Sequence, residues 1–509
     1  MSNCTTFLDN NSKIYNKDAL IFPSENRIYT YAGILDTVNR YANILSSYGV
    51  KKGDRVCIYL PAIPEYLLFY FAIWRIGAIS VPLNIVLKES EVSYMLKDSD
   101  SCAIITDTNS GDVAERASAE ISSDILVLTI GNNEWNDIVS SASNEFRAVY
   151  CDSDDLCQLQ YTSGTTGKQK GAMLTHGNWI AAMDAEKELL GFNSEDIYLG
   201  IYPMAHVGVS WGISALKSGA TWIILERFEL EKYISYIAEY KATVVAAMPP
   251  VIHSLLKTSP GTESVFACVR EMISGGGPLH PSIWKEFYSR FGVPVVNAYG
   301  LSETIVVGTG TAIRPCDYER ADEFRSVGRP VGYSEVKIVD VNDALEELSV
   351  GEIGEIALRG PAVAKGYWKM EEETRSVFLP EGWFLTGDIG YIDDSGMVAI
   401  TDRKKDMIVM SGWKIYPTEV EKAMIEHPDI DDIAIFGCPD SHRGEIPVAA
   451  VVLRTGKKPD KEALKNFAKE RLAGYKVPRE YIFVDILPRV NQWKLLRRQL
   501  RDDYCRDCN

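Results

Sequence analysis

The 509-residue sequence lacks several features that would place it in a specialised class of protein. Basic residues are few, 53 against 70 acidic ones, and the net charge of −17 argues against nucleic-acid binding because phosphate backbones are repelled. The most apolar segment, Tyr66–Trp74, is far shorter than the ~20 residues that a membrane helix needs. The start, MSNCTTFLDNNSKIY, has neither the basic beginning nor the apolar run of a signal peptide. We therefore expect a soluble, cytoplasmic protein without a transmembrane segment.

The cysteines also lack the regular spacing of a disulfide framework or a metal site. Eight of the ten show no ligand spacing: Cys4, Cys57, Cys102, Cys151, Cys157, Cys268, Cys316 and Cys438. Only Cys505 and Cys508 form a CxxC pair, and no second pair accompanies them. We expect these two residues to belong to a frayed tail in a reducing compartment, with a metal or redox role as the alternative.

What the sequence does contain is an alternation of strand-like apolar runs with helical patterns. Residues 54–60 (DRVCIYL) predict a strand, and the helix that follows has Pro64 near its start and Gly77 at its end. Such alternation over the first four fifths indicates α/β layers with parallel sheets. From about Val327, short strands with Gly and Asp turns predict a more β-rich, barrel-like section.

A short charged joint, Thr401–Asp406 (TDRKKD), follows the β-rich section. The roughly 100 residues beyond it contain enough strands and helices for one small α/β domain. We place the boundary at Lys404, which predicts a large N-terminal domain over 1–403 and a small C-terminal domain over 404–509. The sequence contains no internal repeat.

The segment Tyr161–Gly171, YTSGTTGKQKG, contains three glycines, two lysines and four Ser or Thr hydroxyls. It is not a Walker A loop, because Gln169 stands where the second glycine of that motif belongs. Its composition still suits a phosphate, since glycines let backbone N–H groups turn toward an anion while hydroxyl and ammonium groups complete the cradle. A flexible surface loop is the alternative.

This loop, followed by MLTHGN, resembles the phosphate-binding signature of the adenylate-forming enzymes: acyl-CoA synthetases, beetle luciferases and peptide-synthetase adenylation domains. Further segments match in the expected order, namely NAYGLSET, GEIGEIALRGPAVAKGYW, EGWFLTGDIGYID, ITDRKKDMIVMSGWKIYPTEVE, GCPDSHRGEIPVAAVV and PREYIFVDILPRVNQWKLLRRQL. The resemblance spans Tyr161–Leu500 and extends to the first 150 residues. It departs from the usual pattern at Gln169, where proline is common, and at Trp493, where glycine is common.

The resemblance implies a large N-terminal domain of two α/β layered sheets plus a distorted β-barrel, with a small mobile α+β C-terminal domain. It implies an ATP-dependent acid–CoA ligase of fatty acid metabolism or a related process. Such an enzyme adenylates a carboxylic acid, releases pyrophosphate and transfers the acyl group to coenzyme A, giving acyl-CoA and AMP. ATP, Mg²⁺ and coenzyme A are the implied small molecules, and a homodimer is left open.

The resemblance also implies an ATP site. Glu303 matches the Mg²⁺ carboxylate, which suits a hard cation held between phosphates and protein. Tyr299 matches the ring that stacks on adenine, Asn297 the partner of its amine, and Asp388 and Arg403 the ribose anchors. The full set of matched residues is Thr162, Ser163, Gly164, Thr165, Thr166, Gly167, Lys170, Gly275, Gly276, Gly277, Asn297, Ala298, Tyr299, Gly300, Ser302, Asp388, Arg403 and Lys414.

Within the small domain, Lys494 matches the lysine that neutralises charge at the α-phosphate during adenylation. Lys405 matches the hinge position about which the domain alternates between half-reactions. The loop that lines the coenzyme A tunnel corresponds to Ser411, Gly412 and Trp413, and Lys414 corresponds to a phosphate contact in that second state.

The segment Pro203–Gly212 matches the acyl pocket. It contains no acid between Ile201 and Ala215, so the ammonium group of an amino acid would lie unpaired at high cost. His206 matches a histidine beside the substrate carboxylate. The apolar lining predicted around it, namely Val207, Val209, Trp211, Met248, Val306 and Val307, favours an aliphatic or aromatic monocarboxylate.

Three functions stay open at this point. The first is an acid–CoA ligase. The second is a stand-alone adenylating enzyme that loads a carrier protein or carries out luciferase-like oxidation. The third is a non-catalytic acyl-nucleotide-binding relative, for which Gln169 and Trp493 are the motive. The acid and its chain length are left open.

Overall fold

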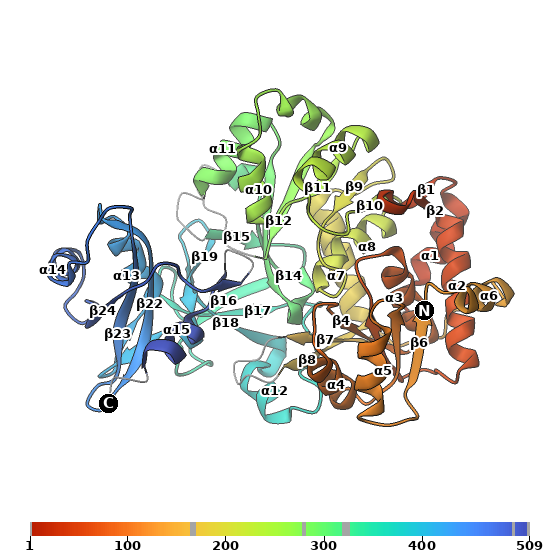
Figure 1. The fold of residues 1–509 in the computed structure, drawn as a ribbon, viewed down its shortest axis with the longest axis horizontal. Helices are drawn as coiled ribbons and strands as arrows, with labels where there is room; N and C mark the ends of the chain where they lie inside the picture. Colours follow the sequence, from red (N-terminus) through yellow and green to blue (C-terminus); the bar gives the residue numbers. More distant parts are fainter. Residues whose placement is uncertain (1–2, 163–168, 277–280, 318–325, 491–493, 506–509) are drawn as a thin grey trace. The chain divides into compact units, whose positions relative to one another are not determined.

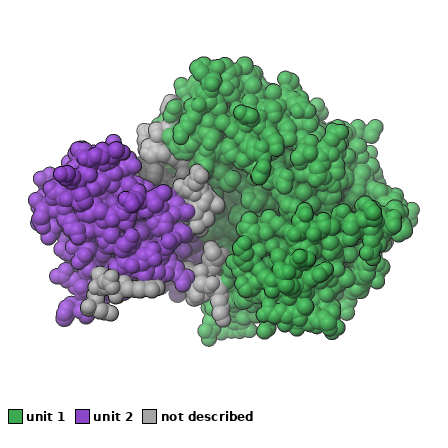
Figure 2. Space-filling view, viewed as in Figure 1, with its two compact units in different colours: residues 1–336, 358–384 green, residues 337–357, 385–509 purple. Residues whose placement is uncertain are grey.

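The computed structural model describes residues 3–162, 169–276, 281–317, 326–490 and 494–505 (Figure 1). The chain divides into two compact units (Figure 2). Unit 1 comprises residues 1–336 and 358–384, and unit 2 comprises 337–357 and 385–509. Segment 404–509 therefore lies wholly in unit 2. The two units are defined by their internal contacts, whereas the predicted boundary at Lys404 marks where the small domain would move. That boundary stays a prediction.

One sheet of unit 1 has six strands in the order β6-β5-β3-β4-β7-β8. Neighbouring strands run parallel except β7 and β8, which form an antiparallel pair. The strands are β3 (Arg55–Tyr59), β4 (Ile79–Leu83), β5 (Ser101–Asp107), β6 (Leu126–Ile130), β7 (Leu156–Thr162) and β8 (Lys170–Thr175). Helices connect the parallel strands, among them α4 (Glu89–Asp98) and α5 (Gly111–Ala119), as parallel pairing requires.

Helix α3 (Pro64–Ile76) shows how closely the sequence predicts a local element. Every residue of α3 except Glu65 is buried, because the helix is apolar on all sides. Pro64 stands at the first helical position, where its missing N–H is not needed. Gly77 ends the helix with φ +80°, a left-handed conformation that favours glycine.

The second sheet of unit 1 orders its strands β2-β1-β10-β9-β11-β12-β13-β14-β15. The pairs from β1 to β13 are parallel, and the pairs at both ends, including β13 with β14, are antiparallel. The strands are β1 (Asp18–Phe22), β2 (Arg27–Thr30), β9 (Ile197–Gly200), β10 (Thr221–Ile224), β11 (Val244–Ala246), β12 (Glu271–Gly275), β13 (Val295–Leu301), β14 (Val306–Ile313) and β15 (Ser326–Pro330).

Helices accompany both sheets of unit 1, and Figure 1 shows α9, α10 and α11 grouped beside strands β11 and β12. The remaining helices of this unit are α1 (Thr6–Ile14), α2 (Tyr31–Ser47), α6 (Asn133–Ser141), α7 (His176–Leu190), α8 (Ser210–Lys217), α9 (Leu230–Tyr240), α10 (Pro249–Leu256), α11 (Pro281–Phe291) and α12 (Glu371–Val377). The predicted α/β class is confirmed.

Unit 2 contains β19 (Val398–Arg403), the part of β18 (Trp383–Ile392) from Leu385 onward, which pairs with it antiparallel, and a separate five-stranded sheet. In that sheet β23 pairs with β20, β22 and β24 around a core that includes Ile408, Ile435 and Val451. Its strands and helices are β20 (Ile408–Met410), β21 (Trp413–Ile415), α13 (Pro417–Met424), β22 (Ile430–Asp440), β23 (Gly444–Leu453), α14 (Lys461–Arg471) and β24 (Glu480–Phe483). The predicted smaller second domain is thus present as a compact α+β unit.

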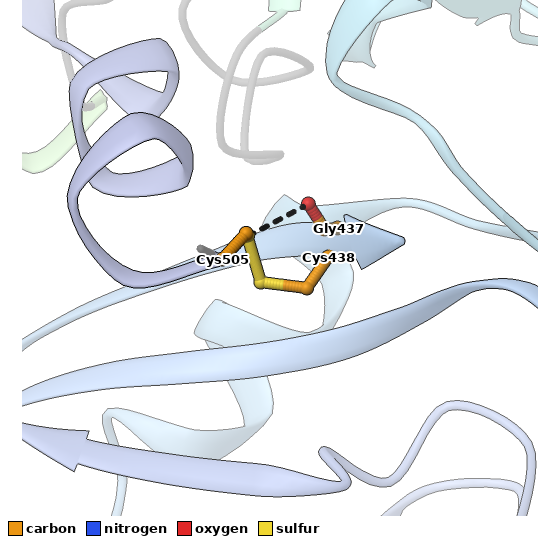
Figure 3. The surroundings of a disulfide bond; sticks show 3 residues. All are labelled: Gly437, Cys438 and Cys505. Carbon is orange, nitrogen blue, oxygen red and sulfur yellow. Dashed lines mark hydrogen bonds between the residues drawn. A yellow bond between two sulfur atoms is a disulfide. The ribbon is translucent and has the colours of Figure 1, made fainter. Parts of the chain in front are cut away.

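The short helix α15 (Arg497–Tyr504) ends at a disulfide between Cys505 and Cys438, the latter on β22 (Figure 3). The expectation that Cys505 belongs to a frayed tail is therefore wrong. Leu500 is buried in a core with Phe436 and Leu487. Helix α15 therefore packs against the rest of unit 2 through an apolar contact as well as the covalent bond. Cys508 lies outside the described residues.

Across the part of the chain that the structure describes, every helix is too short or too polar to traverse a lipid bilayer.

Candidate active site

The predicted phosphate loop joins the paired ends of β7 and β8. Thr162 and Lys170 face each other as the last pair before the loop, and both are partly buried. Ser163, Gly164, Thr165, Thr166 and Gly167 lie outside the described residues. The carbonyl of Gln169 accepts a hydrogen bond of 2.9 Å from the hydroxyl of Tyr94. This residue is anchored through its backbone carbonyl, which a proline would also provide.

A contact between three side chains links the loop to the predicted metal carboxylate. The ammonium of Lys170 lies 5.1 Å from the ring centre of Tyr367, within the range of a cation–π interaction. The hydroxyl of Tyr367 donates to Oε1 of Glu303 at 2.8 Å. Burial and the Glu303 charge raise the pKa of Tyr367 well above its ordinary value, so the hydroxyl keeps its proton.

Tyr367 is a site residue that motif matching missed. It lies within the matched segment GEIGEIALRGPAVAKGYW, but no role was assigned to it. The structure brings it to Glu303 because the segment around it bridges to Ala172 of β8, while the amide of Ala364 donates to the carbonyl of Glu303 at 2.7 Å. A tyrosine two residues after the lysine of that motif was the available signal.

The backbone after Glu303 adopts an unusual conformation. Ile305 and Val306 have φ values of +47° and +50°, which β-branched residues rarely adopt. Thr304 stabilises this turn, since its hydroxyl accepts from the amide of Leu301 and donates to the carbonyl of Val306, each at 2.9 Å. Backbone strain of this kind concentrates at functional sites, and here it follows the buried Glu303 directly.

The predicted adenine residues lie where β12 meets β13. Gly275 pairs with Ala298, and Asn297 pairs with Ser274 in the parallel register. Asn297 is 5% exposed, and its Oδ1 has no hydrogen-bond partner among the described residues. A buried amide oxygen without a partner calls for an explanation, and the exocyclic amine of adenine would satisfy it.

The other matched residues of this region share the same strands. Tyr299 is buried on β13, and Ser302 begins the short turn that contains Glu303. A Cβ atom at Gly300 would lie 1.7 Å from the carbonyl oxygen of Val306, so glycine is required there. Gly276 has φ +77° and open space around it, whereas Gly277 lies outside the described residues.

Asp388 and Arg403, the predicted ribose anchors, lie opposite each other on β18 and β19 of unit 2. Nε of Arg403 is 2.7 Å from Oδ1 of Asp388, and the Asp388 side chain is 2% exposed. A buried carboxylate beside a guanidinium is a strong hydrogen-bond acceptor for hydroxyl groups.

Ion pairs fix the residues on either side of Lys405 in the charged joint. Nζ of Lys404 is 2.6 Å from Oε2 of Glu355, which is buried. The guanidinium of Arg497 lies 3.6 Å from Asp406 and 2.7 Å from Glu421. Lys405 itself is exposed between these anchors.

The predicted tunnel loop is a two-residue hairpin turn between β20 and β21. Ser411 and Gly412 both have positive φ, +49° and +83°, and nothing lies within 4 Å of a Cβ built on Gly412. The Trp413 ring is 59% exposed and stacks on Tyr475 with 4.8 Å between ring centres. Nζ of Lys414 lies 3.8 Å from Oδ2 of Asp340, so this residue already faces an acid within unit 2.

Lys494 begins a short strand, β26 (Lys494–Leu495), whose backbone pairs with β25 (Arg489–Val490) just before α15. Trp493, where the sequence departs from the family pattern, lies outside the described residues.

The predicted acyl segment forms a turn followed by α8. Nδ1 of the exposed His206 accepts from the amide of Gly208 at 3.1 Å, which leaves the proton of a neutral ring on Nε2, where it can donate to a carboxylate. Val207, Val209, Trp211 and Val307 are buried, and Met248 and Val306 are partly buried.

An acid reaches the acyl segment from another element. Glu186 on α7 accepts a hydrogen bond from Ser210, next to Trp211, although residues 201–215 contain no acid. Burial raises the pKa of Glu186 well above its ordinary value and so favours the protonated carboxyl. A neutral carboxyl gives no ion pair to a substrate ammonium group.

Comparison with known proteins agrees with this arrangement. The family model "AMP-binding enzyme" matches residues 8–368, and "AMP-binding enzyme C-terminal domain" matches 419–494. The chain is 33% identical to the long-chain-fatty-acid–CoA ligase FadD13 of Mycobacterium tuberculosis, over 96% of this chain and 95% of that protein. It is 31% identical to 4-coumarate–CoA ligase-like 9 of rice, Oryza sativa, over 94% and 88% of the two chains. The ATP-bound MatB of Rhodopseudomonas palustris matches in structure with a TM-score of 0.90 at 29% identity, over all of both chains.

The chain belongs to the AMP-binding enzyme family, the adenylate-forming enzymes. Within that family it is an AMP-forming acid–CoA ligase that uses ATP.

Proposed function

We propose that this ligase activates an apolar monocarboxylate, either aliphatic as in a fatty acid or aromatic, with Mg²⁺ bound to ATP. In the first half-reaction a carboxylate oxygen attacks the α-phosphorus, the bond to the β-phosphate oxygen breaks, and pyrophosphate leaves. In the second half-reaction the thiol of coenzyme A loses its proton and attacks the acyl carbonyl, and AMP leaves. Electrostatic stabilisation and positioning supply most of the catalysis.

We assign the metal, phosphate, adenine and carboxylate contacts to residues of unit 1. Glu303 holds the metal ion, because a buried carboxylate fixed by Tyr367 is a suitable oxygen ligand for Mg²⁺. Lys170 contacts the phosphates, and the free Oδ1 of Asn297 accepts from adenine. His206 donates from Nε2 to the substrate carboxylate, beside the apolar side chains of the acyl segment.

The residues of unit 2 serve the ribose and the second half-reaction. Asp388 and Arg403 bind the ribose hydroxyls, and Lys494 neutralises charge at the α-phosphate. We further propose that segment 404–509 moves about Lys405 between half-reactions, with Ser411, Gly412 and Trp413 lining the path of the thiol and Lys414 meeting a phosphate. We also propose a cytoplasmic location, where ATP and coenzyme A are both available.

The observation that carries the proposed substrate class is the acyl segment itself. Its buried side chains are apolar apart from Ser210, and burial disfavours the charged form of Glu186, the acid that Ser210 contacts. Transfer of a charged ammonium group into such a pocket without an ionised partner is strongly unfavourable. This supports a substrate whose only charged group is its carboxylate.

A panel of carboxylic acids tests the proposal. Aliphatic acids of increasing length, cinnamate-type aromatic acids, dicarboxylates and α-amino acids are each supplied with ATP, Mg²⁺ and coenzyme A, and both AMP and acyl-CoA are measured. We expect turnover with aliphatic or aromatic monocarboxylates only. Preferred turnover of a dicarboxylate or an amino acid would contradict the substrate class, and AMP formation without acyl-CoA would point to a different acceptor.

A further inference from the structure

A cluster of sulfur and imidazole groups lies at the end of the β7–β8 hairpin opposite the phosphate loop. One ligand atom each from Cys4, Cys157 and His176 lies within 4.8 Å of the other two, and all three residues are buried. Sγ of Cys4 is 3.1 Å from Nδ1 of His176. Among the described residues this is the one group of three or more cysteine, histidine or acidic side chains close enough together to hold a metal ion.

The cluster joins three separate segments of unit 1. Cys157 is the second residue of β7, His176 is the first residue of α7 directly after β8, and Cys4 precedes α1. The strand pair that ends with Leu156 opposite Thr175 therefore places Cys157 and His176 beside each other. The phosphate loop lies at the other end of the same two strands.

The segment that carries Cys4 is fixed in place by its neighbours. The side-chain amide of Asn3 donates to the carbonyls of Trp74 and Val149 at 2.8 and 3.1 Å. Asn3, Cys4 and Thr5 are at most 3% exposed. These hydrogen bonds fix the segment that carries Cys4 beside His176, and Asn3 also donates to the sulfur of Cys151 at 3.6 Å.

The imidazole of His176 is incompletely satisfied. Its Nδ1 accepts a hydrogen bond of 3.3 Å from the backbone amide of Cys4 and lies 3.1 Å from the Cys4 sulfur, while its Nε2 is buried without any hydrogen-bond partner in the described structure. Buried polar atoms without a partner are rare in native proteins. A further thiol, that of the fully buried Cys151, lies beside this group: its sulfur accepts a hydrogen bond of 3.6 Å from the side-chain amide of Asn3 and is not among the three ligand atoms that lie within 4.8 Å of one another.

The chemistry of these groups selects a soft divalent cation. Thiolate sulfur and imidazole nitrogen are the preferred ligands of Zn²⁺, and three cysteines with one histidine make a closed tetrahedral set without room for a substrate. Mg²⁺ prefers oxygen ligands, so it would not compete for this set.

We propose that Cys4, Cys157 and His176, with Cys151 in the fourth position, bind one structural zinc ion. The ion fastens the N-terminal segment to the base of the β7–β8 hairpin, and it is independent of the Mg²⁺ that accompanies ATP. Because the site is closed to solvent, the ion enters as the chain folds and contributes to the stability of the folded state.

Metal analysis of the purified full-length protein tests the proposal. Protein produced with zinc in the medium and dialysed against metal-free buffer is analysed by mass spectrometry of the elements, and we expect about one zinc per chain. Protein produced with cobalt in place of zinc should show thiolate-to-cobalt charge-transfer absorption together with the visible bands of a tetrahedral site. Zinc far below one equivalent together with the absence of that absorption overturns the proposal.

A matched pair of variants assigns the ligands. Cys157→Ser removes a proposed ligand, whereas Cys57→Ser changes an equally buried cysteine on β3 of the same sheet, beside Ser101. We expect zinc retention to fall by more than about tenfold in the first and to stay unchanged in the second. Equal zinc content in the two variants overturns the assignment.

If Cys157→Ser does not fold, His176→Gln and the cobalt spectrum of the unmodified protein decide the question. Neither readout depends on turnover, so a failure of the proposed acid specificity would leave the zinc result unaffected.

Discussion

The residues that we assign to the two units differ in how the protein holds them. In unit 1, three assigned residues are at least partly buried and linked by side-chain contacts: Lys170 lies over the ring of Tyr367, and Tyr367 donates to Glu303. In unit 2, the residues assigned to motion and to the thiol path lie on short turns: Lys405 is exposed, and a Cβ on Gly412 would meet nothing within 4 Å. The difference supports our proposal that unit 1 holds one geometry for the nucleotide, while the turns of unit 2 change conformation without loss of core packing.

Asp388 and Arg403 are the informative exception. They belong to unit 2, yet Asp388 is nearly fully buried and its partner is fixed by strand pairing. The division between rigid and adaptable residues therefore follows burial and strand pairing rather than unit membership.

The largest effect is expected from Lys494→Ala. Loss of a charge contact made in the transition state typically costs about 10²–10³-fold in rate, so adenylation should fall by that factor. Thioester formation from a supplied acyl-adenylate should change little. Pyrophosphate exchange and acyl-CoA release measure the two half-reactions, and Lys469→Ala, an exposed change on α14, is the control. Equal losses in both half-reactions would contradict the assignment.

Glu303→Gln should have the next largest effect. The amide keeps the shape of the side chain but removes the charge that binds Mg²⁺, so half-maximal activity should require roughly 10–100 times more Mg²⁺. Binding of adenosine, which carries no phosphate, should be nearly unchanged. Activity at every Mg²⁺ concentration equal to that of the unmodified protein would rule out Glu303 as the ligand.

Tyr367→Phe should weaken the same property less. It removes the hydroxyl that positions Glu303 but keeps the ring beneath Lys170. Partners of metal ligands typically contribute about tenfold or more to metal affinity, so the Mg²⁺ requirement should rise by about tenfold. Tyr94→Phe, which loses the contact to the Gln169 carbonyl instead, is the comparison. An equal rise in the two variants would show a general loosening of the hairpin.

Gly412→Leu tests the turn of unit 2. A leucine at φ +83° is strained by about 1–2 kcal/mol, and its side chain would enter open space that we assign to the thiol. We expect slower thioester formation with adenylation retained. Gly412→Asn separates the two causes, because asparagine tolerates the left-handed conformation with a small side chain. A loss of adenylation as severe as the loss of thioester formation would mean that the turn is needed in both states.

Glu186→Gln should have the smallest effect, and the size of that effect depends on pH. Because burial raises the folded-state pKa of Glu186 far above its unfolded value near ~4.3, the unfolded chain loses this proton first as the pH rises. The free energy of unfolding therefore decreases with pH above that value, and glutamine removes this decrease.

Melting temperatures from acidic to weakly alkaline pH measure the Glu186 effect. The Glu186→Gln variant should match the unmodified protein below the unfolded pKa and become the more stable of the two by a few degrees as the pH rises. Glu188→Gln, on the exposed face of α7, is the control and should not change the slope. A difference in melting temperature that is independent of pH would contradict a buried neutral carboxyl.

Local elements followed directly from the sequence. The apolar run of α3 with Pro64 and Gly77 predicted a helix with both of its ends. Short-range preferences decide such elements, because the residues that cap or terminate them are close in the chain. The roles of the glycine-rich loop, of Glu303 and of the Asp388–Arg403 pair were inferred from motifs and stay predictions.

The contacts that complete the site were decided by the tertiary structure. Tyr367 meets Glu303 across 64 positions and Cys4 meets His176 across 172, and neither spacing suggests a contact. Cys505 meets Cys438 in the same way, where the sequence pointed to a frayed tail. Such pairs arise because sheet order and strand register bring distant segments together, whereas periodicity and motif spacing report only on neighbours along the chain.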